Sequence, residues 1–168
     1  QRLYENTRSG RGSVFERSAF PELDELLVGG ETICIGNAEL EVISTPGHAL
    51  GHVCFFDRKR RALFTGDHIT PVIVPNVITF LWDYDPDRDP LADYFSSCAK
   101  LRPLEVETVF PGHDHVFFDL RGRLDELACH HEERLQAMRR VANCEWETAF
   151  GFASKVTWPR GAFDVLGD

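Results

Sequence analysis

The sequence predicts an α/β or α+β fold in which helices pack on a mixed or antiparallel sheet. The order of its segments supports this class: strand-like segments come first, between residues 32 and 65, and strand-like and helix-like segments are mixed after residue 89. At 168 residues and 43% hydrophobic content, the chain is long enough to bury one core. We therefore expect one domain over residues 30–142, preceded over residues 1–29 by an arm or the remnant of a larger segment, and followed by a helical extension over residues 143–168.

The first expected element is a hairpin. Residues 32–35 and 38–44 read as strands, and Gly36 and Asn37 between them suit a two-residue turn. Apolar and acidic residues alternate along residues 38–42. The second strand is therefore expected to have one apolar, buried face and one polar face toward solvent.

A second hairpin is expected over residues 52–56 and 62–65. The basic segment 57–61 joins its strands and reads as a solvated turn. Residues 69–88 then hold three prolines among aromatic residues, which is typical of a long loop. The aromatic residues of this loop and of the later segment 117–118 either shape a substrate pocket or belong to the core; they are Phe80, Trp82, Tyr84, Phe117 and Phe118.

The pair Asp89-Pro90 predicts a helix start, because Asp is a good N-cap and Pro is favoured at the first helical position. An apolar stripe at helical spacing follows, made of Leu91, Tyr94, Phe95, Cys98 and Leu101. This helix is expected to pack on the sheet.

Residues 107–110 predict one more short strand, and a long helix is expected from Asp119. One face of that helix is apolar, with Leu120, Leu124, Leu127, Leu135 and Met138. Residues 144–155 read as a further helix, and the Pro-Arg-Gly sequence at residues 159–161 breaks any continuation.

Composition argues against several classes of function. The net charge of −9 and the pI near 5.2 argue against a nucleic-acid partner, although a local basic patch is compatible with them. No apolar run reaches the ~20 residues that span a bilayer, and the first residues have no signal-peptide core, so no membrane association is expected. The five cysteines are odd in number and widely spaced, which indicates reduced thiols and a cytoplasmic location.

Three short segments share one design, in which a β-rich run reaches a Gly and a His or Asp follows. They present His48 in Thr-Pro-Gly-His, Asp67 in Phe-Thr-Gly-Asp and His113 in Pro-Gly-His. Imidazole nitrogens and carboxylate oxygens on rigid elements are what zinc or a similar divalent ion requires. A single His after Pro-Gly is usually a turn residue, but three such positions together favour a metal site.

The other histidines have two readings each. His52 is either an outer partner of the metal ligands or a packing residue at a strand start. His68 and His115 either orient ligands, meet substrate, or have no role in a site. His131 falls on the apolar stripe of the last long helix and reads as a core residue, with His130 on its flank.

These motifs, in this order and spacing, resemble the C-terminal half of the metallo-β-lactamase-fold hydrolases, especially the branch of glyoxalase II and β-lactamase-like protein 2. The resemblance covers roughly residues 30–140 and implies half of an αββα sandwich. It further implies that His48 ligates a first zinc ion, that Asp67 bridges two and that His113 ligates the second. The implied reaction is hydrolysis of a thioester, lactone or similar ester by a metal-bound hydroxide; a nuclease is the nearest enzymatic variant.

The sequence departs from this family at one motif. The family's H-x-H-x-D-H motif is absent, because Phe117 and Phe118 stand where the Asp and His would follow the only H-x-H, at His113 and His115. We therefore interpret the chain as the second half of a truncated parent hydrolase, with impaired activity of its own. The alternative is a non-catalytic oligomerising fragment with an incomplete metal site. In either case an exposed sheet face predicts self-association, as a homodimer whose copies fill each other's missing layer.

Overall fold

The computed structural model describes residues 24–77, 87–143 and 146–156. The chain forms two compact units, Gln1–Leu120 and Arg121–Asp168, which are treated one at a time. The predicted pocket aromatics Phe80, Trp82 and Tyr84 lie outside the described residues.

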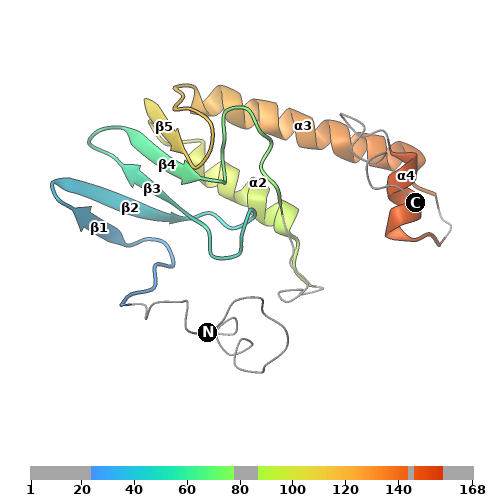
Figure 1. The fold of residues 1–168 in the computed structure, drawn as a ribbon, viewed down its shortest axis with the longest axis horizontal. Coiled ribbons are helices and arrows are strands. Elements are labelled where there is room, and N and C mark those ends of the chain that lie inside the picture. Colours follow the sequence, from blue (N-terminus) through green and yellow to red (C-terminus); the bar gives the residue numbers. More distant parts are fainter. Residues whose placement is uncertain (1–23, 78–86, 144–145, 157–168) are drawn as a thin grey trace. The chain divides into compact units, whose positions relative to one another are not determined.

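The first unit is built on a five-stranded sheet in the order β1-β2-β3-β4-β5 (Figure 1). Its strands are β1 (Thr32–Ile35), β2 (Ala38–Ser44), β3 (Val53–Asp57), β4 (Ala62–Gly66) and β5 (Thr108–Pro111). Neighbours are antiparallel from β1 to β4, and β4 and β5 are parallel. The predicted α/β class with a mixed sheet is therefore confirmed.

This pairing sets which strand ends meet. Because β2 and β4 are both antiparallel to β3, they run in the same direction, and β5 runs with them. The carboxyl ends of β2, β4 and β5 consequently lie at one edge of the sheet. The three Gly-containing motifs follow these three strand ends.

Both predicted hairpins are present. The strands of the first have the expected bounds and meet at Gly36, whose φ of +61° is a left-handed value that Gly adopts readily. In the second hairpin the strands begin or end one residue later than expected. Its basic turn is not merely solvated, because Asp57 accepts hydrogen bonds from the main-chain N–H and the guanidinium of Arg60.

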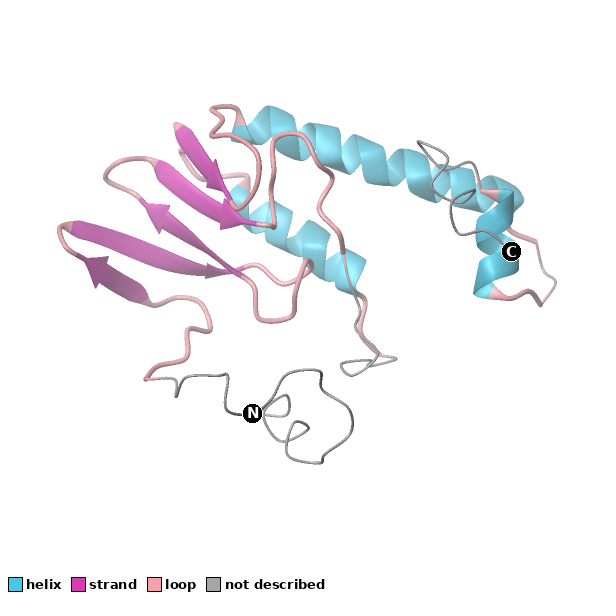
Figure 2. Ribbon diagram, viewed as in Figure 1, coloured by secondary structure: helices cyan, strands magenta, loops and turns pink. Residues whose placement is uncertain are grey.

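Helix α2 (Pro90–Leu101) begins where the sequence predicts. The Asp89 carboxylate accepts hydrogen bonds from the main-chain N–H groups of Leu91 and Ala92, which would otherwise lack partners at a helix start. The helix runs along one side of the sheet (Figure 2). Two of its side chains hold the segment after β2: Ser97 Oγ donates to the Pro46 carbonyl at 2.8 Å and Lys100 Nζ to the Ser44 carbonyl at 2.9 Å.

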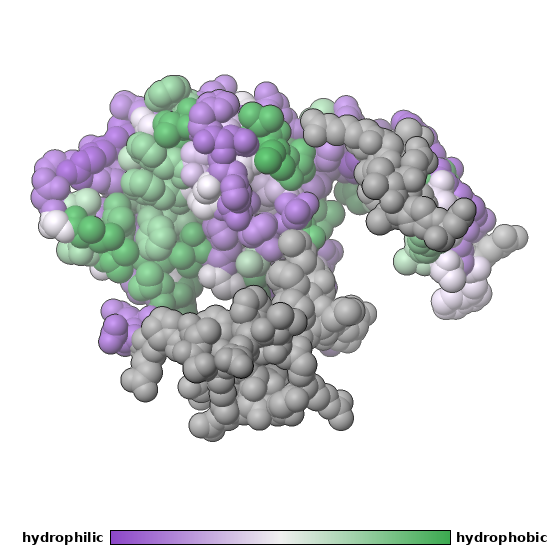
Figure 3. Space-filling view, viewed as in Figure 1, coloured by the Kyte–Doolittle hydropathy of each residue, from purple (hydrophilic) through white to green (hydrophobic). Residues whose placement is uncertain are grey.

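The two faces of the sheet differ in burial. One face carries the buried side chains Cys54, Phe56, Leu63 and Val109. The opposite face is apolar but only partly covered: Ile35 is 62% and Phe64 38% exposed, and Phe64 stacks on Phe110 with ring centroids 4.9 Å apart. Figure 3 shows hydrophobic residues gathered over the strands on this second face. The predicted self-association through this face stays a prediction.

The second unit contains most of α3 (Leu120–Val141) and α4 (Ala149–Lys155). On α3, the predicted stripe is buried at Leu124 and Leu127, as it is at Leu120. Helix α4 is shorter than expected because Thr148 caps it, with Oγ1 accepting from the Gly151 N–H at 3.0 Å. No helix in the described part of the chain is both long enough and apolar enough to span a bilayer.

Candidate metal centre

The three predicted ligands come together at one sheet edge. Asp67 directly follows β4, His113 lies two residues after β5, and His48 lies four residues after β2. Asp67 is in the middle: its Oδ2 lies 3.7 Å from His48 Nε2 and its Oδ1 lies 3.3 Å from His113 Nε2. One carboxylate thus faces two imidazoles, one on each oxygen.

His48 is held by a main-chain atom. Its Nδ1 lies 2.8 Å from the carbonyl oxygen of Asn76, in the loop after β4. A carbonyl only accepts hydrogen bonds, so Nδ1 carries the proton and donates it. In a neutral ring the lone pair is then on Nε2, the atom that faces Asp67. A metal-binding His is usually oriented in this way, by a hydrogen bond from the ring nitrogen that does not bind the metal.

Two glycines allow this approach. Gly47 has a φ of +138°, and a Cβ there would lie 2.6 Å from the Cα of Tyr94 on α2. A Cβ on Gly112 would overlap Asp67 Oδ1 and lie 3.0 Å from the carbonyl carbon of Gly66. Glycine is therefore required at both positions for the loops to pack as they do.

Two further histidines lie close to the predicted ligands: His52 is next to His48, and His68 is next to His52. His52 is half-buried, with its ring 6.1 Å from that of His48 and 5.4 Å from that of His68 between centroids. Burial, followed by the neighbouring His48, lowers the pKa of His52. Its Nδ1 lies 2.8 Å from Thr45 Oγ1.

His68 is fully buried and points toward α2. Its Nε2 lies 3.9 Å from Cys98 Sγ, and its ring lies 4.7 Å from that of Tyr94. Burial lowers the pKa of His68 to about 3, so the ring is neutral at pH 7. Its Nδ1 has no hydrogen-bond partner among the residues that the structure describes.

His115 is exposed on the loop that carries His113. Val109 and Phe117 close this loop with two main-chain hydrogen bonds, of 2.8 and 3.1 Å. Asp114 takes a φ of +67° at its tip, a conformation that Asp tolerates better than most residues. His113 is therefore presented from a closed turn, while His115 makes no contact with Asp67 or His48 that the structure records.

The donor set fits a divalent cation in type. Two imidazoles and one carboxylate are ligands that zinc accepts, and the hydrogen bond to Asn76 prepares His48 for this role. Across residues 24–77, 87–143 and 146–156, however, no group of three or more His, Cys, Asp or Glu side chains is closed enough to hold an ion. The described residues thus form two donor pairs that share Asp67.

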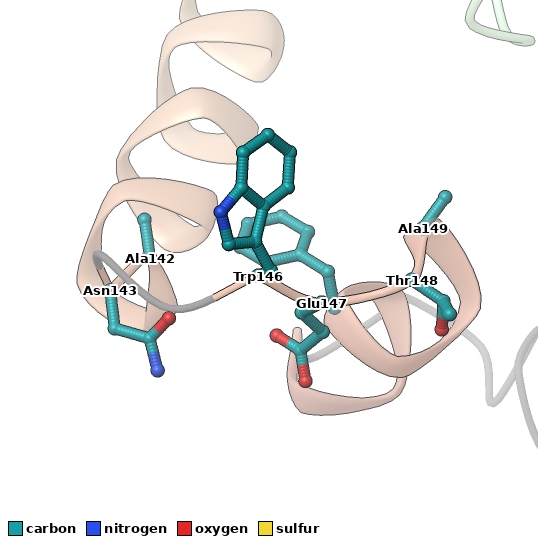
Figure 4. A pocket seen from close by; sticks show the side chains of 7 residues that line it. Ala142, Asn143, Trp146, Glu147, Thr148 and Ala149 are labelled. Carbon is teal, nitrogen blue, oxygen red and sulfur yellow. The ribbon is translucent and has the colours of Figure 1, made fainter.

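A cavity of about 390 Å³ lies in the second unit (Figure 4). Trp146 and Glu147 contribute to its lining, and the Glu147 carboxylate is paired with Lys155 at 2.5 Å. None of the predicted site residues lines it. It is therefore not the candidate metal centre.

Sequence reasoning did not identify two groups that shape the centre. One is the Asn76 carbonyl, which as a main-chain atom has no residue-type signature. The other is Thr45, which is fully buried and bonded to His52. Thr45 belongs to the Thr-Pro-Gly-His motif. The only hint of its role in the sequence is that His52 follows it seven residues later.

Together these features define an α/β protein with imidazole and carboxylate groups clustered at the carboxyl ends of parallel strands. The family model of the metallo-beta-lactamase superfamily matches residues 3–113. The chain belongs to this superfamily.

Individual relatives agree with this assignment. The chain is 31% identical over 140 residues to the acyl-coenzyme A thioesterase MBLAC2 of Gallus gallus, which covers 81% of this chain and 47% of that protein. It is 34% identical over 110 residues to the hydroxyacylglutathione hydrolase of Rhodospirillum rubrum, covering 62% of this chain and 38% of that one. Both similarities cover more than half of this chain.

Solved structures show the same fold. A metallo-beta-lactamase family protein of Thermus thermophilus superimposes with a TM-score of 0.67 at 30% identity, covering 84% of this chain and 48% of that one. A beta-lactamase domain protein of Burkholderia ambifaria gives a TM-score of 0.74 at 27% identity, covering 82% and 42%. The chain therefore spans less than half the length of each of these relatives and structures.

Proposed function

We propose that the chain contributes His48, Asp67 and His113 to the metal centre of a hydrolase that acts on a thioester, lactone or similar ester. Zinc is the proposed metal, with Asp67 between two ions. The observation that carries the proposal is the shared carboxylate: Asp67 presents one oxygen to each imidazole, at 3.7 and 3.3 Å. With this arrangement Asp67 would be able to share one ion with each imidazole.

Each residue has a defined task in this proposal. Asp67 would supply one carboxylate oxygen and negative charge to each donor pair. His48 offers Nε2 because Asn76 holds the proton on Nδ1. When bound, a divalent cation would supply Lewis-acid polarisation of the ester carbonyl and make hydroxide available near neutral pH.

The names of the relatives support the substrate class. One is an acyl-coenzyme A thioesterase and another a hydroxyacylglutathione hydrolase. Both names denote cleavage of an acyl group from a thiol, that of coenzyme A or of glutathione. A nuclease variant is less favoured, because the net charge of −9 opposes a polyanionic substrate.

A thioester assay tests the proposal. Hydrolysis of an acyl-coenzyme A or acyl-glutathione is followed by the appearance of the free thiol, with and without added Zn²⁺. We expect turnover that depends on zinc and is lost in Asp67→Asn. The matched control is Asp125→Asn, an exposed acid on α3, which should keep full activity. Equal activity of Asp67→Asn and the unsubstituted chain would contradict the proposal.

A non-catalytic fragment is the second candidate. It is favoured by the absence, among the described residues, of a closed group of three metal-binding side chains. The sequence also contains no H-x-H-x-D-H motif to supply further donors. Under this alternative the chain self-associates and binds metal weakly or not at all. Metal analysis separates the two, because only the first predicts stoichiometric zinc together with turnover.

A further inference from the structure

We propose that His52, held by Thr45, is a positioning residue that fixes the three ligand-bearing loops relative to one another. The inference rests on the proposed function, since these loops carry His48, Asp67 and His113. His52 itself contacts neither metal nor substrate in this proposal. It acts through the main chain of Gly66.

Thr45 and His52 close the loop that carries His48. The main-chain N–H of Thr45 donates to the His52 carbonyl at 2.9 Å, and Thr45 Oγ1 lies 2.8 Å from His52 Nδ1. The His52 N–H also donates to the Ala49 carbonyl at 3.2 Å. Because Thr45 is fully buried, water does not compete for its hydroxyl. His52 is thereby held both by its main chain and by the Nδ1 atom of its ring.

The other side of the ring supports Gly66. A Cβ on Gly66 would lie 2.9 Å from His52 Nε2, so the imidazole packs directly against this glycine. Gly66 has a φ of +51° and sets the direction in which Asp67 leaves β4. Loss of the ring would leave space beside the residue that aims Asp67.

Gly66 passes this support to the third loop. Its carbonyl accepts the N–H of Gly112 at 2.7 Å, and Gly112 immediately precedes His113. The His52 ring, Gly66 and Gly112 therefore form one continuous line of contacts. That line joins the loop of His48 to Asp67 and to the loop of His113.

Amide hydrogen exchange in the metal-free 168-residue chain tests the positioning directly. In Thr45→Val we expect the Gly112 amide to exchange about fivefold faster, as the loss of one buried hydrogen bond implies. Thr45→Ser keeps the hydroxyl and should restore the original rate. The Leu63 amide in β4 serves as reference for global unfolding, so each rate is read relative to it and a generally weakened variant is still informative.

Cobalt titration links positioning to the metal. Co²⁺ binding to Thr45→Val should be weaker by about 10- to 100-fold, the usual effect of losing an outer partner of a ligand, with an altered visible absorption spectrum. Thr45→Ser should behave as the unsubstituted chain. Cys54→Ala is the matched control and should bind Co²⁺ as the unsubstituted chain does. It removes the other neighbour of the Thr45 hydroxyl, Cys54 Sγ at 3.3 Å, and leaves the contact with His52 in place.

His52→Asn gives a second, independent variant. Its amide keeps a polar atom near Thr45 but removes the ring atoms beside Gly66, so faster exchange at Gly112 is again expected. Unchanged relative exchange at Gly112 in both Thr45→Val and His52→Asn would overturn the inference. Failure of the unsubstituted chain to bind Co²⁺ would instead contradict the proposed function, and the exchange measurement would still decide the role of His52.

Discussion

His48 donates its Nδ1 proton to the main-chain carbonyl of Asn76 across 2.8 Å. The two residues are 28 positions apart, and the bond ties the loop after β2 to the loop after β4. It fixes both the orientation of the imidazole and the nitrogen that carries the lone pair. The direction of His48 toward Asp67 is therefore a property of the fold and does not depend on a bound ion.

Gly112 should be sensitive to the smallest substitution. Gly112→Ala would force a methyl group against Asp67 Oδ1 and the Gly66 carbonyl carbon. We expect weaker zinc binding and a loss of roughly 1–3 kcal/mol in the free energy of unfolding. Calorimetric zinc titration and urea denaturation measure the two effects. Gly51→Ala, where a Cβ meets nothing within 4 Å, should change neither; similar behaviour of both variants would contradict the assigned contact.

The N-cap of α2 gives a stability test that does not involve the metal. Asp89→Ala removes the acceptor for the N–H groups of Leu91 and Ala92 and should cost about 1 kcal/mol in the free energy of unfolding. Asp89→Ser supplies another capping oxygen and should recover most of this loss. Urea denaturation of the three proteins makes the comparison, and equal midpoints for all three would refute the cap.

Thiol reactivity should follow burial. Burial raises the pKa of Cys54 to about 12 and that of Cys98 to about 11, so at pH 8 almost none of either is thiolate, the reactive form. Cys34 and Cys129 are exposed, and Glu133 raises the pKa of Cys129. Among the four cysteines that the structure describes, iodoacetamide at pH 8 should therefore modify Cys34 first, then Cys129, and leave the buried Cys54 and the half-buried Cys98 unmodified. Peptide mass spectrometry gives the order, and early labelling of Cys54 would contradict its burial.

Self-association of the chain remains a prediction from its partly exposed apolar sheet face. Ile35 lies on this face at the edge strand β1, and a second copy could cover it with the same face. We expect a homodimer in sedimentation experiments that Ile35→Lys weakens. Thr32→Lys, on the same strand but the other face, is the control and should leave the dimer intact. A monomer at all concentrations would exclude this prediction.

Local sequence patterns predicted most of the sheet and α2. Residues 38–42 alternate with period two, and Asp89-Pro90 is a strong helix start, so β2 has the expected bounds and α2 begins at the expected residue. The parallel pairing of β4 with β5 was not predicted specifically, because pairing partners depend on contacts between distant segments. The end of the chain was less predictable: α4 begins five residues later than the apolar pattern suggested, at the Thr148 cap.

The candidate site was predictable only in part. Gly followed by His or Asp marked all three ligand candidates, and strand direction explains why they meet. His68 could not be distinguished from a site residue, because its burial under α2 depends on Tyr94 and Cys98, which are distant in sequence. The support that Asn76 gives His48 comes from a main-chain carbonyl, an atom that every residue has.

Calorimetric titration of the metal-free chain with Zn²⁺, compared with Asp67→Ala, tests the shared carboxylate most directly. The unsubstituted chain should bind zinc saturably, and Asp67→Ala should lose more than about 100-fold in affinity, beyond the usual effect of removing an outer partner. Asp125→Ala should bind as the unsubstituted chain does. Absence of zinc binding, or equal binding by Asp67→Ala, would contradict a metal centre built on Asp67.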